Sequence, residues 1–148
     1  MATPSNPVLT MLKADHKKVK ALFAEYQAAT PRKQHDIAQT IIHELEIHAE
    51  LEEELIYPAI RKGTKDDTLM NEATEEHHLV HVLIAELKEL EPSDATFKAK
   101  CTVLGELVKH HEKEEEGEMF PKAQKAKIDW EALKAEVMER KEHLMAQA

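Results

Sequence analysis

The feature that most constrains this chain is a histidine–glutamate motif that occurs twice in nearly the same context. The first copy is HAELEEELIYPAI from His48, and the second is HEKEEEGEMFPKA from His111. Aligned without gaps, the corresponding residues are His48/His111, Glu52/Glu115, Glu53/Glu116, Tyr57/Phe120 and Pro58/Pro121. Residues four positions apart share one face of a helix. Each copy therefore directs an imidazole and a carboxylate toward the same region of space.

A second pair of short motifs precedes these copies. Asp15-His16 comes before the first and Glu76-His77 before the second. The interval from His16 to His77 is almost the same as that from His48 to His111. The chain therefore resembles a two-helix unit used twice.

Composition limits the classes of protein to which the chain can belong. Its 148 residues suit one domain, and only 3 Gly and 6 Pro predict an all-helical fold with short links. A net charge of −9 disfavours nucleic acid as a partner. No signal peptide or membrane-spanning run is recognisable, and the single cysteine, Cys101, excludes an internal disulfide. We therefore expect a cytoplasmic protein without a membrane partner; the sequence identifies no protein partner.

Prolines, glycines and capping residues predict the helix ends. Asn6-Pro7 opens a first helix to about Ala29, and Pro31 opens a second to about Arg61, where Lys62-Gly63-Thr64 stops it. A third helix, capped by Asp66 or Asp67, runs to Leu90, and a fourth follows Glu91-Pro92-Ser93-Asp94 and reaches about Lys125. Asp129 caps a shorter last helix. These lengths favour an up-down-up-down four-helix bundle over residues 1–126, with an accessory C-terminal helix of the same domain over 127–148.

Apolar residues at helical spacing mark the inward face of each long helix. The stripes are Leu9, Leu12, Val19 and Phe23; Ile37, Ile41, Leu45, Leu55 and Ala59; Ala73, Ile84 and Leu87; and Phe97, Cys101, Leu104, Val108 and Met119. Seven titratable residues fall into these stripes: His16, His48, Glu52, His77, His81, His111 and Glu115. At the rise of an α-helix, all lie roughly 15 to 18 Å from one end of the bundle. Unpaired polar groups in a core are costly, so we expect a metal to satisfy them.

Some assignments leave an alternative register. His110-x3-Glu114 has the same spacing as His111-x3-Glu115, and we favour His111 because it keeps the distance to Pro121 that His48 keeps to Pro58. His78 could replace His77, but its spacing to His81 would then be three. The remaining histidines, His35, His43, His110 and His143, are expected to face solvent.

Other residues have structural interpretations. Tyr57 and Phe120 are expected to pack in the core or wall a pocket, and a local kink is expected at Pro58 and Pro121. Cys101 is expected to be a buried apolar filler. The run Glu112–Glu118 is expected to be mainly a solvated acidic face.

With these residues, the chain resembles the hemerythrin and HHE cation-binding domains over about residues 8–125. The shared features are a lone histidine on the first helix, H-x3-E followed by Tyr/Phe-Pro on the second and fourth, and H-x3-H on the third. The resemblance implies a non-haem di-iron centre in a four-helix bundle. His77, His81 and His111 would hold one iron and His16 and His48 the other. Glu52 and Glu115 would bridge both with an oxo or hydroxo group.

The same resemblance implies a ligand. The iron with two histidines would keep an open position for dioxygen, nitric oxide, peroxide or a small anion. Animal oxygen carriers have an Asp one residue further along in the last motif, whereas H-x3-E here is similar to bacterial-type members. The ligand would be bound for sensing, storage or protection, or peroxide would be disproportionated, and both functions need the same seven ligands and an open site. Iron donation to damaged iron–sulfur clusters is a third alternative. Other chemistries have less support, since Glu-x-x-His occurs in the long helices only at Glu75-x-x-His78 and no zinc-protease, phosphate-loop or nucleophile-elbow motif is present.

Overall fold

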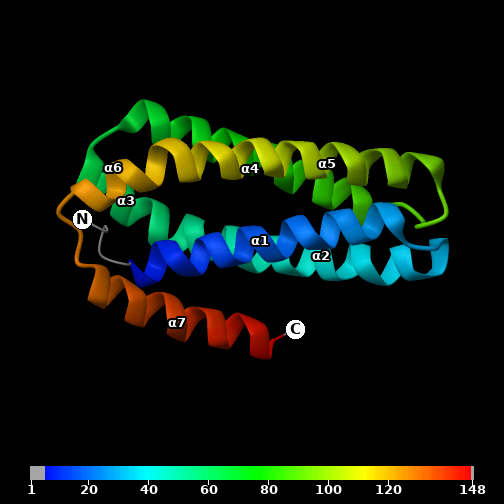
Figure 1. Cartoon of the computed structure of the whole chain (residues 1–148), viewed down its shortest axis with the longest axis horizontal. Coiled ribbons are helices and arrows are strands. Elements are labelled where there is room, and N and C mark those ends of the chain that lie inside the picture. The colour runs from blue at the N-terminus through cyan, green and yellow to red at the C-terminus, as the bar shows by residue number, and fades with distance from the viewer. Residues whose placement is uncertain (1–5, 148) are drawn as a thin grey trace.

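A computed structural model describes residues 6–147 and contains four long helical rods with a fifth helix beside them (Figure 1). The first and third rods are α1 (Pro7–Ala28) and α4 (Asp67–Glu89). The second rod comprises α2 (Pro31–Leu51), η1 (Glu52–Ile56) and α3 (Tyr57–Thr64). The fourth comprises α5 (Ala95–Glu114), η2 (Glu115–Met119) and α6 (Phe120–Lys125), and α7 (Trp130–Ala146) follows. This confirms the expected all-α, up-down-up-down bundle with a short accessory helix.

Side chains at the start of the helices satisfy backbone donors that have no partner within the helix. Asn6 Oδ1 accepts two backbone hydrogen bonds, each 3.1 Å long. Asp66, Asp94 and Asp129 each accept one from the first turn of the helix that follows. Within residues 6–147, no helix combines the length and apolar character needed to cross a membrane.

The second rod ends later than expected, because Gly63 lies inside α3 and does not stop it. The rod continues to Thr64, and Lys65 ends it in the left-handed conformation with φ of 57°. A Cβ atom at Gly63 would lie only 2.6 Å from Cγ1 of Ile128. Glycine therefore suits this position because the segment that leads into α7 approaches closely, and not because of the backbone conformation.

Two five-residue π-turns, η1 and η2, interrupt the second and fourth rods at equivalent places in the repeat. The N–H of Tyr57 donates to the carbonyl of Glu52, five residues earlier, and Phe120 does the same to Glu115. Each turn directly precedes Pro58 or Pro121, in the sequence region where kinks were expected. Proline has no N–H for the carbonyl four residues before it, which favours a wider turn at that point.

The first π-turn shifts the inward face of the second rod by one residue. Ile56 and Ile60 are fully buried, whereas Leu55 and Ala59 are only partly buried. The regular helical spacing of the sequence predicted the reverse, with Leu55 and Ala59 facing inward. That prediction was wrong because the extra residue in the turn rotates every later residue by about 100° around the helix axis. The prediction for the fourth rod is confirmed. Met119, which the sequence placed on the inward face, is buried at the position equivalent to Ile56.

The bundle contains two apolar clusters with a polar layer between them. One cluster gathers residues near the start of α1, including Leu12, with residues of η1, α3, α6 and α7. The other contains Val19, Leu45 and Leu104 toward the opposite end. His16 lies between Leu12 and Val19 on α1, at the boundary between the clusters. The polar layer is therefore enclosed by apolar packing on both sides.

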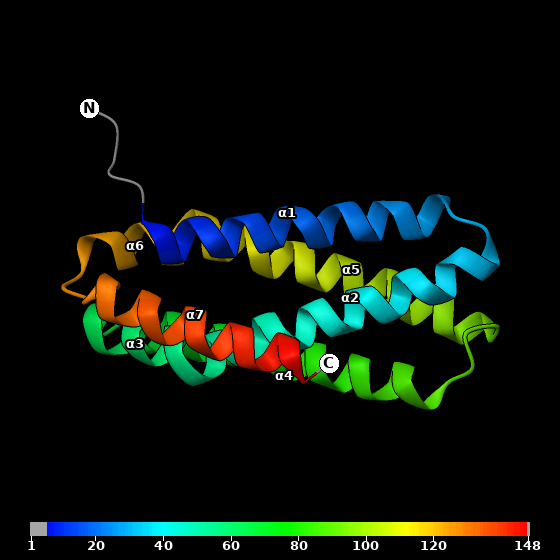
Figure 2. The same ribbon diagram turned by 90° about the horizontal axis from the view of Figure 1, so that it is seen from below.

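The accessory helix α7 covers only one side of the bundle and lies along α1 and α2 (Figure 2). Leu133, Val137 and Leu144 are buried in the first apolar cluster. Arg140 also forms ion pairs of 3.1 and 3.0 Å with Glu50 and Glu54. The helix is thus part of the packed core.

Candidate metal centre

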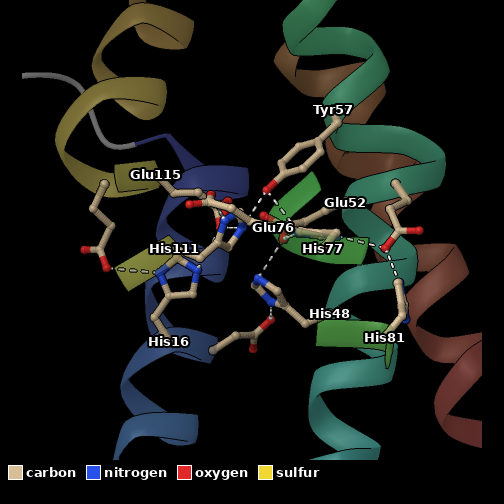
Figure 3. Close-up of polar contacts among 12 residues, drawn as sticks. His16, His48, Glu52, Tyr57, Glu76, His77, His81, His111 and Glu115 are labelled. Atoms are coloured by element: carbon tan, nitrogen blue, oxygen red, sulfur yellow. Dashed lines mark hydrogen bonds and ion pairs between the residues drawn. The ribbon is translucent and has the colours of Figure 1, made fainter. Parts of the chain in front are cut away.

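Six titratable side chains from all four rods meet in the polar layer (Figure 3). They are His16 on α1, His48 on α2, Glu52 in η1, His77 on α4, His111 on α5 and Glu115 in η2. Glu52 and Glu115 are only 0% and 1% exposed. Each carboxylate is the first residue of a π-turn and lies one helical turn after its histidine, so it keeps the inward face of the helix before it. Their burial requires compensating partners.

The layer consists of two groups of potential metal ligands. Glu52, His77 and His111 have donor atoms within 4.8 Å of one another, and so do His16, His48 and Glu115. Both carboxylates connect the groups. Oε1 of Glu52 lies 3.2 Å from Nε2 of both His48 and His77. Oε1 of Glu115 lies 3.6 Å from Nε2 of His16 and 3.0 Å from Nε2 of His111.

The layer does not satisfy its own hydrogen-bonding capacity. In the part of the chain that the structure describes, six buried atoms have no hydrogen-bond partner, namely Nε2 of His16 and of His48 and both carboxylate oxygens of Glu52 and of Glu115. The short Nε2–Oε1 separations just described therefore lack hydrogen-bond geometry. A cavity of about 30 Å³ is lined by His48, Glu52 and Glu115 together with His77 and His111. Nitrogen and oxygen donors directed at one small space fit a transition-metal centre.

Four histidines of the layer are oriented by carboxylates on their outer side. The Nδ1–carboxylate contacts are His16–Glu116 at 3.0 Å, His48–Asp15 at 3.1 Å, His77–Glu53 at 2.8 Å and His111–Glu76 at 2.6 Å. An acceptor at Nδ1 holds the proton there and leaves Nε2 available to a metal. This orienting role was not predicted. Its sequence signal was the repetition of Asp15 and Glu76 before His16 and His77, and of Glu53 and Glu116 in the two histidine–glutamate motifs.

An aromatic residue lies beside each half of the layer. The Tyr57 hydroxyl is 3.1 Å from Nε2 of His77 and 2.9 Å from Nε2 of His111. Its counterpart Phe120 instead stacks on His16, with ring centroids 6.1 Å apart and an angle of 11° between the planes. The two halves therefore differ chemically, because only one has a hydroxyl directed at its histidines.

His81 is the one proposed ligand that lies outside the layer. Its side chain is 47% exposed, and Nε2 lies 2.7 Å from Oε2 of Glu53. Together with His77, these two residues form a further group of potential ligands at the surface. The inward stripe of α4 continues from His77 to Val80 and Ile84, which turns His81 toward solvent.

The remaining histidines lie outside the layer. On the fourth rod, His111 is buried, whereas His110 is 62% exposed and lies 3.1 Å from Glu114. His78 is exposed on α4, as are His35 and His143 elsewhere. His43 is partly buried and not fully solvent-facing as expected. The structure thus places His77 and His111, and not their neighbours, in the layer.

The charges within the layer stabilise one another. Burial disfavours a charged imidazole, but Glu52 and a second carboxylate outweigh it and raise the pKa of His77 to about 9. Glu115 and a second carboxylate likewise raise the pKa of His111 to about 10. Burial also opposes ionisation of Glu52, yet the charge of His48 holds the pKa of Glu52 well below its usual range. A metal ion entering the layer would take the place of these protons.

Comparison with known proteins agrees with this geometry. The family model for the hemerythrin HHE cation-binding domain matches residues 8–123. A DNA nickase of Nostoc sp. (strain PCC 7120 / SAG 25.82 / UTEX 2576) is 33% identical over 112 residues, which are 74% of this chain and 31% of that protein. The chain thus spans about a third of that relative's length. A hemerythrin HHE cation-binding domain-containing protein from Mycobacterium kansasii has a similar structure, with a TM-score of 0.72 and 23% identity over 89% of this chain and 85% of that one.

Proposed function

The chain belongs to the hemerythrin HHE cation-binding family, and on this premise we propose that its polar layer holds two iron ions that bind a small ligand. The ligand would be dioxygen, nitric oxide or peroxide, bound for sensing, storage or protection. The observation that carries the proposal is the set of six buried donor atoms without hydrogen-bond partners. Apolar clusters lie on both sides of the layer. Protonated histidines offset part of the charge of Glu52 and Glu115, and a bound cation would give all six atoms the partners that they lack.

The distribution of donors supports two ions in preference to one. Glu52 approaches histidines of both groups, and so does Glu115. Glu52 and Glu115 would therefore serve both ions, His16 and His48 would hold one, and His77 and His111 would hold the other. Ligation by His81 would require its side chain to leave Glu53.

The donor set favours iron over metals that prefer sulfur. Imidazole and carboxylate suit Fe, Mn or Zn, and the one thiol, Cys101, is buried in an apolar cluster. Two iron ions would supply redox chemistry and an open coordination position for the ligand. The chain would orient the imidazoles through the outer carboxylates and exclude bulk water through the two apolar clusters.

The test is metal analysis of protein expressed with excess iron, combined with ultraviolet–visible spectra before and after oxygen, nitric oxide and peroxide. We expect about two irons per chain and spectral changes that saturate at a fixed ratio of ligand to protein. Continuous consumption of peroxide would instead support the enzymatic alternative. One zinc per chain, or no metal, would contradict the di-iron proposal.

A further inference from the structure

A groove of about 650 Å³ lies between α1 and α5 and is rich in lysine. Its lysines are Lys13, Lys17, Lys20, Lys109 and Lys113. All are exposed, and among the described residues none of them has a carboxylate within ion-pair distance. Other lysines do have such partners, as in the 2.8 Å ion pair of Lys18 with Glu44. The groove is therefore a local excess of positive charge on a chain whose net charge is −9.

The groove reaches one half of the metal centre. His16 lines it, together with Glu112 and Glu116, and Glu116 is engaged by Nδ1 of His16 at 3.0 Å. Glu112 also lines the inner cavity that contains His48 and Glu52. It therefore stands at the boundary between the groove and the cavity. In the first repeat, the equivalent position is Ala49.

The equivalent surface on the other half of the molecule has different chemistry. In the repeat, the five groove lysines correspond to Thr74, His78, His81, Glu46 and Glu50. Four of the five equivalent positions on the α2–α4 side thus have histidine or glutamate where the groove has lysine. The duplicated fold does not require lysines at these positions. Their accumulation beside His16 needs a separate explanation.

We propose that the lysine groove guides small inorganic anions to the His16–His48 half of the centre, with Glu112 at the boundary to the cavity. This inference rests on the proposed function, since it concerns the ligand of the same metal centre. A concave surface lined by one sign of charge concentrates ions of the opposite sign and can raise association rates by about 10- to 1,000-fold at low ionic strength. The ligand class would be small inorganic anions such as azide or nitrite, whose charge responds to the lysines, unlike neutral dioxygen, nitric oxide or hydrogen peroxide.

The kinetic test uses azide and the iron-loaded protein. The groove variant combines Lys13→Gln, Lys17→Gln and Lys20→Gln. The control variant combines Lys33→Gln, Lys98→Gln and Lys134→Gln. The control removes the same charge from exposed lysines outside the groove. We expect the groove variant to bind azide about tenfold more slowly than wild type at low ionic strength. This difference should largely disappear near 1 M salt, where the screening length is about 3 Å. Equal association rates in the two variants would overturn the proposal.

A second variant tests the boundary. Glu112→Ala introduces the residue that the first repeat already has at the equivalent position, and it removes the bulk of the side chain and its acidic group from the boundary. We expect a several-fold faster association of azide. An unchanged or slower rate would overturn the role of Glu112.

A readout without metal separates this proposal from the proposed function. In metal-free protein, a dianionic gadolinium chelate should enhance NMR relaxation of amides in residues 13–20 and 109–113 more than a neutral chelate does. The groove variant should lose this excess and the control should keep it. If neither wild type nor the two variants bind iron but the relaxation differences are as expected, the proposed function fails while the groove still concentrates anions. If the pattern is absent, the groove proposal fails whatever the metal content.

Discussion

His16 donates its Nδ1–H to the carboxylate of Glu116 at 3.0 Å, although the two residues are 100 positions apart in the chain. The matching contact joins His77 to Glu53 at 2.8 Å. Glu53 and Glu116 occupy equivalent positions in the two repeats, so each repeat supplies the carboxylate that orients a histidine of the other. The metal centre is therefore assembled only when the two halves pack together.

The first prediction concerns these outer carboxylates. Replacing Glu116 with alanine removes the acceptor that holds the proton on Nδ1 of His16, so metal affinity should fall by about 10- to 100-fold. Glu116→Gln keeps a carbonyl acceptor and should restore part of the loss. Glu118→Ala, two residues away on the exposed face, serves as the control. Metal titrations that give the same affinity for all three variants would contradict the role of Glu116.

The second prediction separates the roles of the proposed ligands. Glu52 and Glu115 each approach histidines of both groups, so Glu52→Ala or Glu115→Ala should lose more iron per chain than His16→Ala. His35→Ala and His143→Ala alter exposed histidines and should keep full occupancy. Equal losses in all five variants, measured by elemental analysis, would indicate general destabilisation and not ligation.

The third prediction concerns the hydroxyl of Tyr57. Tyr57→Phe removes its contacts with His77 and His111 and introduces the residue that the second repeat has at this position. Without metal, the free energy of unfolding should fall by about 1 to 2 kcal/mol. The loss should be smaller with iron bound, because Nε2 of both histidines then faces the metal. Chemical denaturation of both forms checks this, and a larger loss in the iron-bound form would instead indicate that Tyr57 contributes directly to metal binding.

The fourth prediction concerns pH and metal removal. The folded pKa values of His77 and His111, about 9 and about 10, lie above the ordinary value of 6.5. Their stabilisation of the metal-free protein is therefore fully present below about pH 6.5 and is lost as the pH rises through 9 to 10. Metal binding must displace the same protons and weakens as the pH falls.

Paired thermal melts of the iron-loaded and chelator-treated protein between pH 6 and 9 test this linkage. We expect the iron-loaded form to melt at the higher temperature near neutral pH. The difference should narrow toward acid and widen toward alkali. Indistinguishable melting temperatures near pH 7 would mean that these residues do not jointly hold a metal.

The fifth prediction concerns the packing of the segment before α7. Gly63→Ala would place a Cβ atom 2.6 Å from Cγ1 of Ile128, so the crowding should cost about 1 to 3 kcal/mol. Gly117→Ala provides the control, because its Cβ would have no neighbour within 4 Å. That variant should be neutral or stabilised by up to about 1 kcal/mol. Urea denaturation measures the free energy of unfolding of both variants. Equal values would show that the side chain of Ile128 moves aside without loss of stability.

Local spacing along the chain was enough to predict the helices and most of the residues that face inward. Prolines and capping side chains marked the helix ends, and residues three or four apart identified the stripes on which His16, His48 and His111 lie. Both kinds of signal act within a few residues along one helix. They were therefore sufficient for the bundle and for most of the polar layer.

Features that depend on contacts between distant segments became clear only in the folded bundle. A single π-turn exchanged Leu55 for Ile56 in the core, and the inward stripe of α4 turned His81 toward Glu53 at the surface. The partners of Nδ1 on His16 and His77 come from the opposite repeat. Each of these outcomes depends on how one helix is rotated against another. Pro58 favours a wider turn locally, but which side chain then faces the core, at about 100° of rotation per residue, is fixed by packing across the bundle.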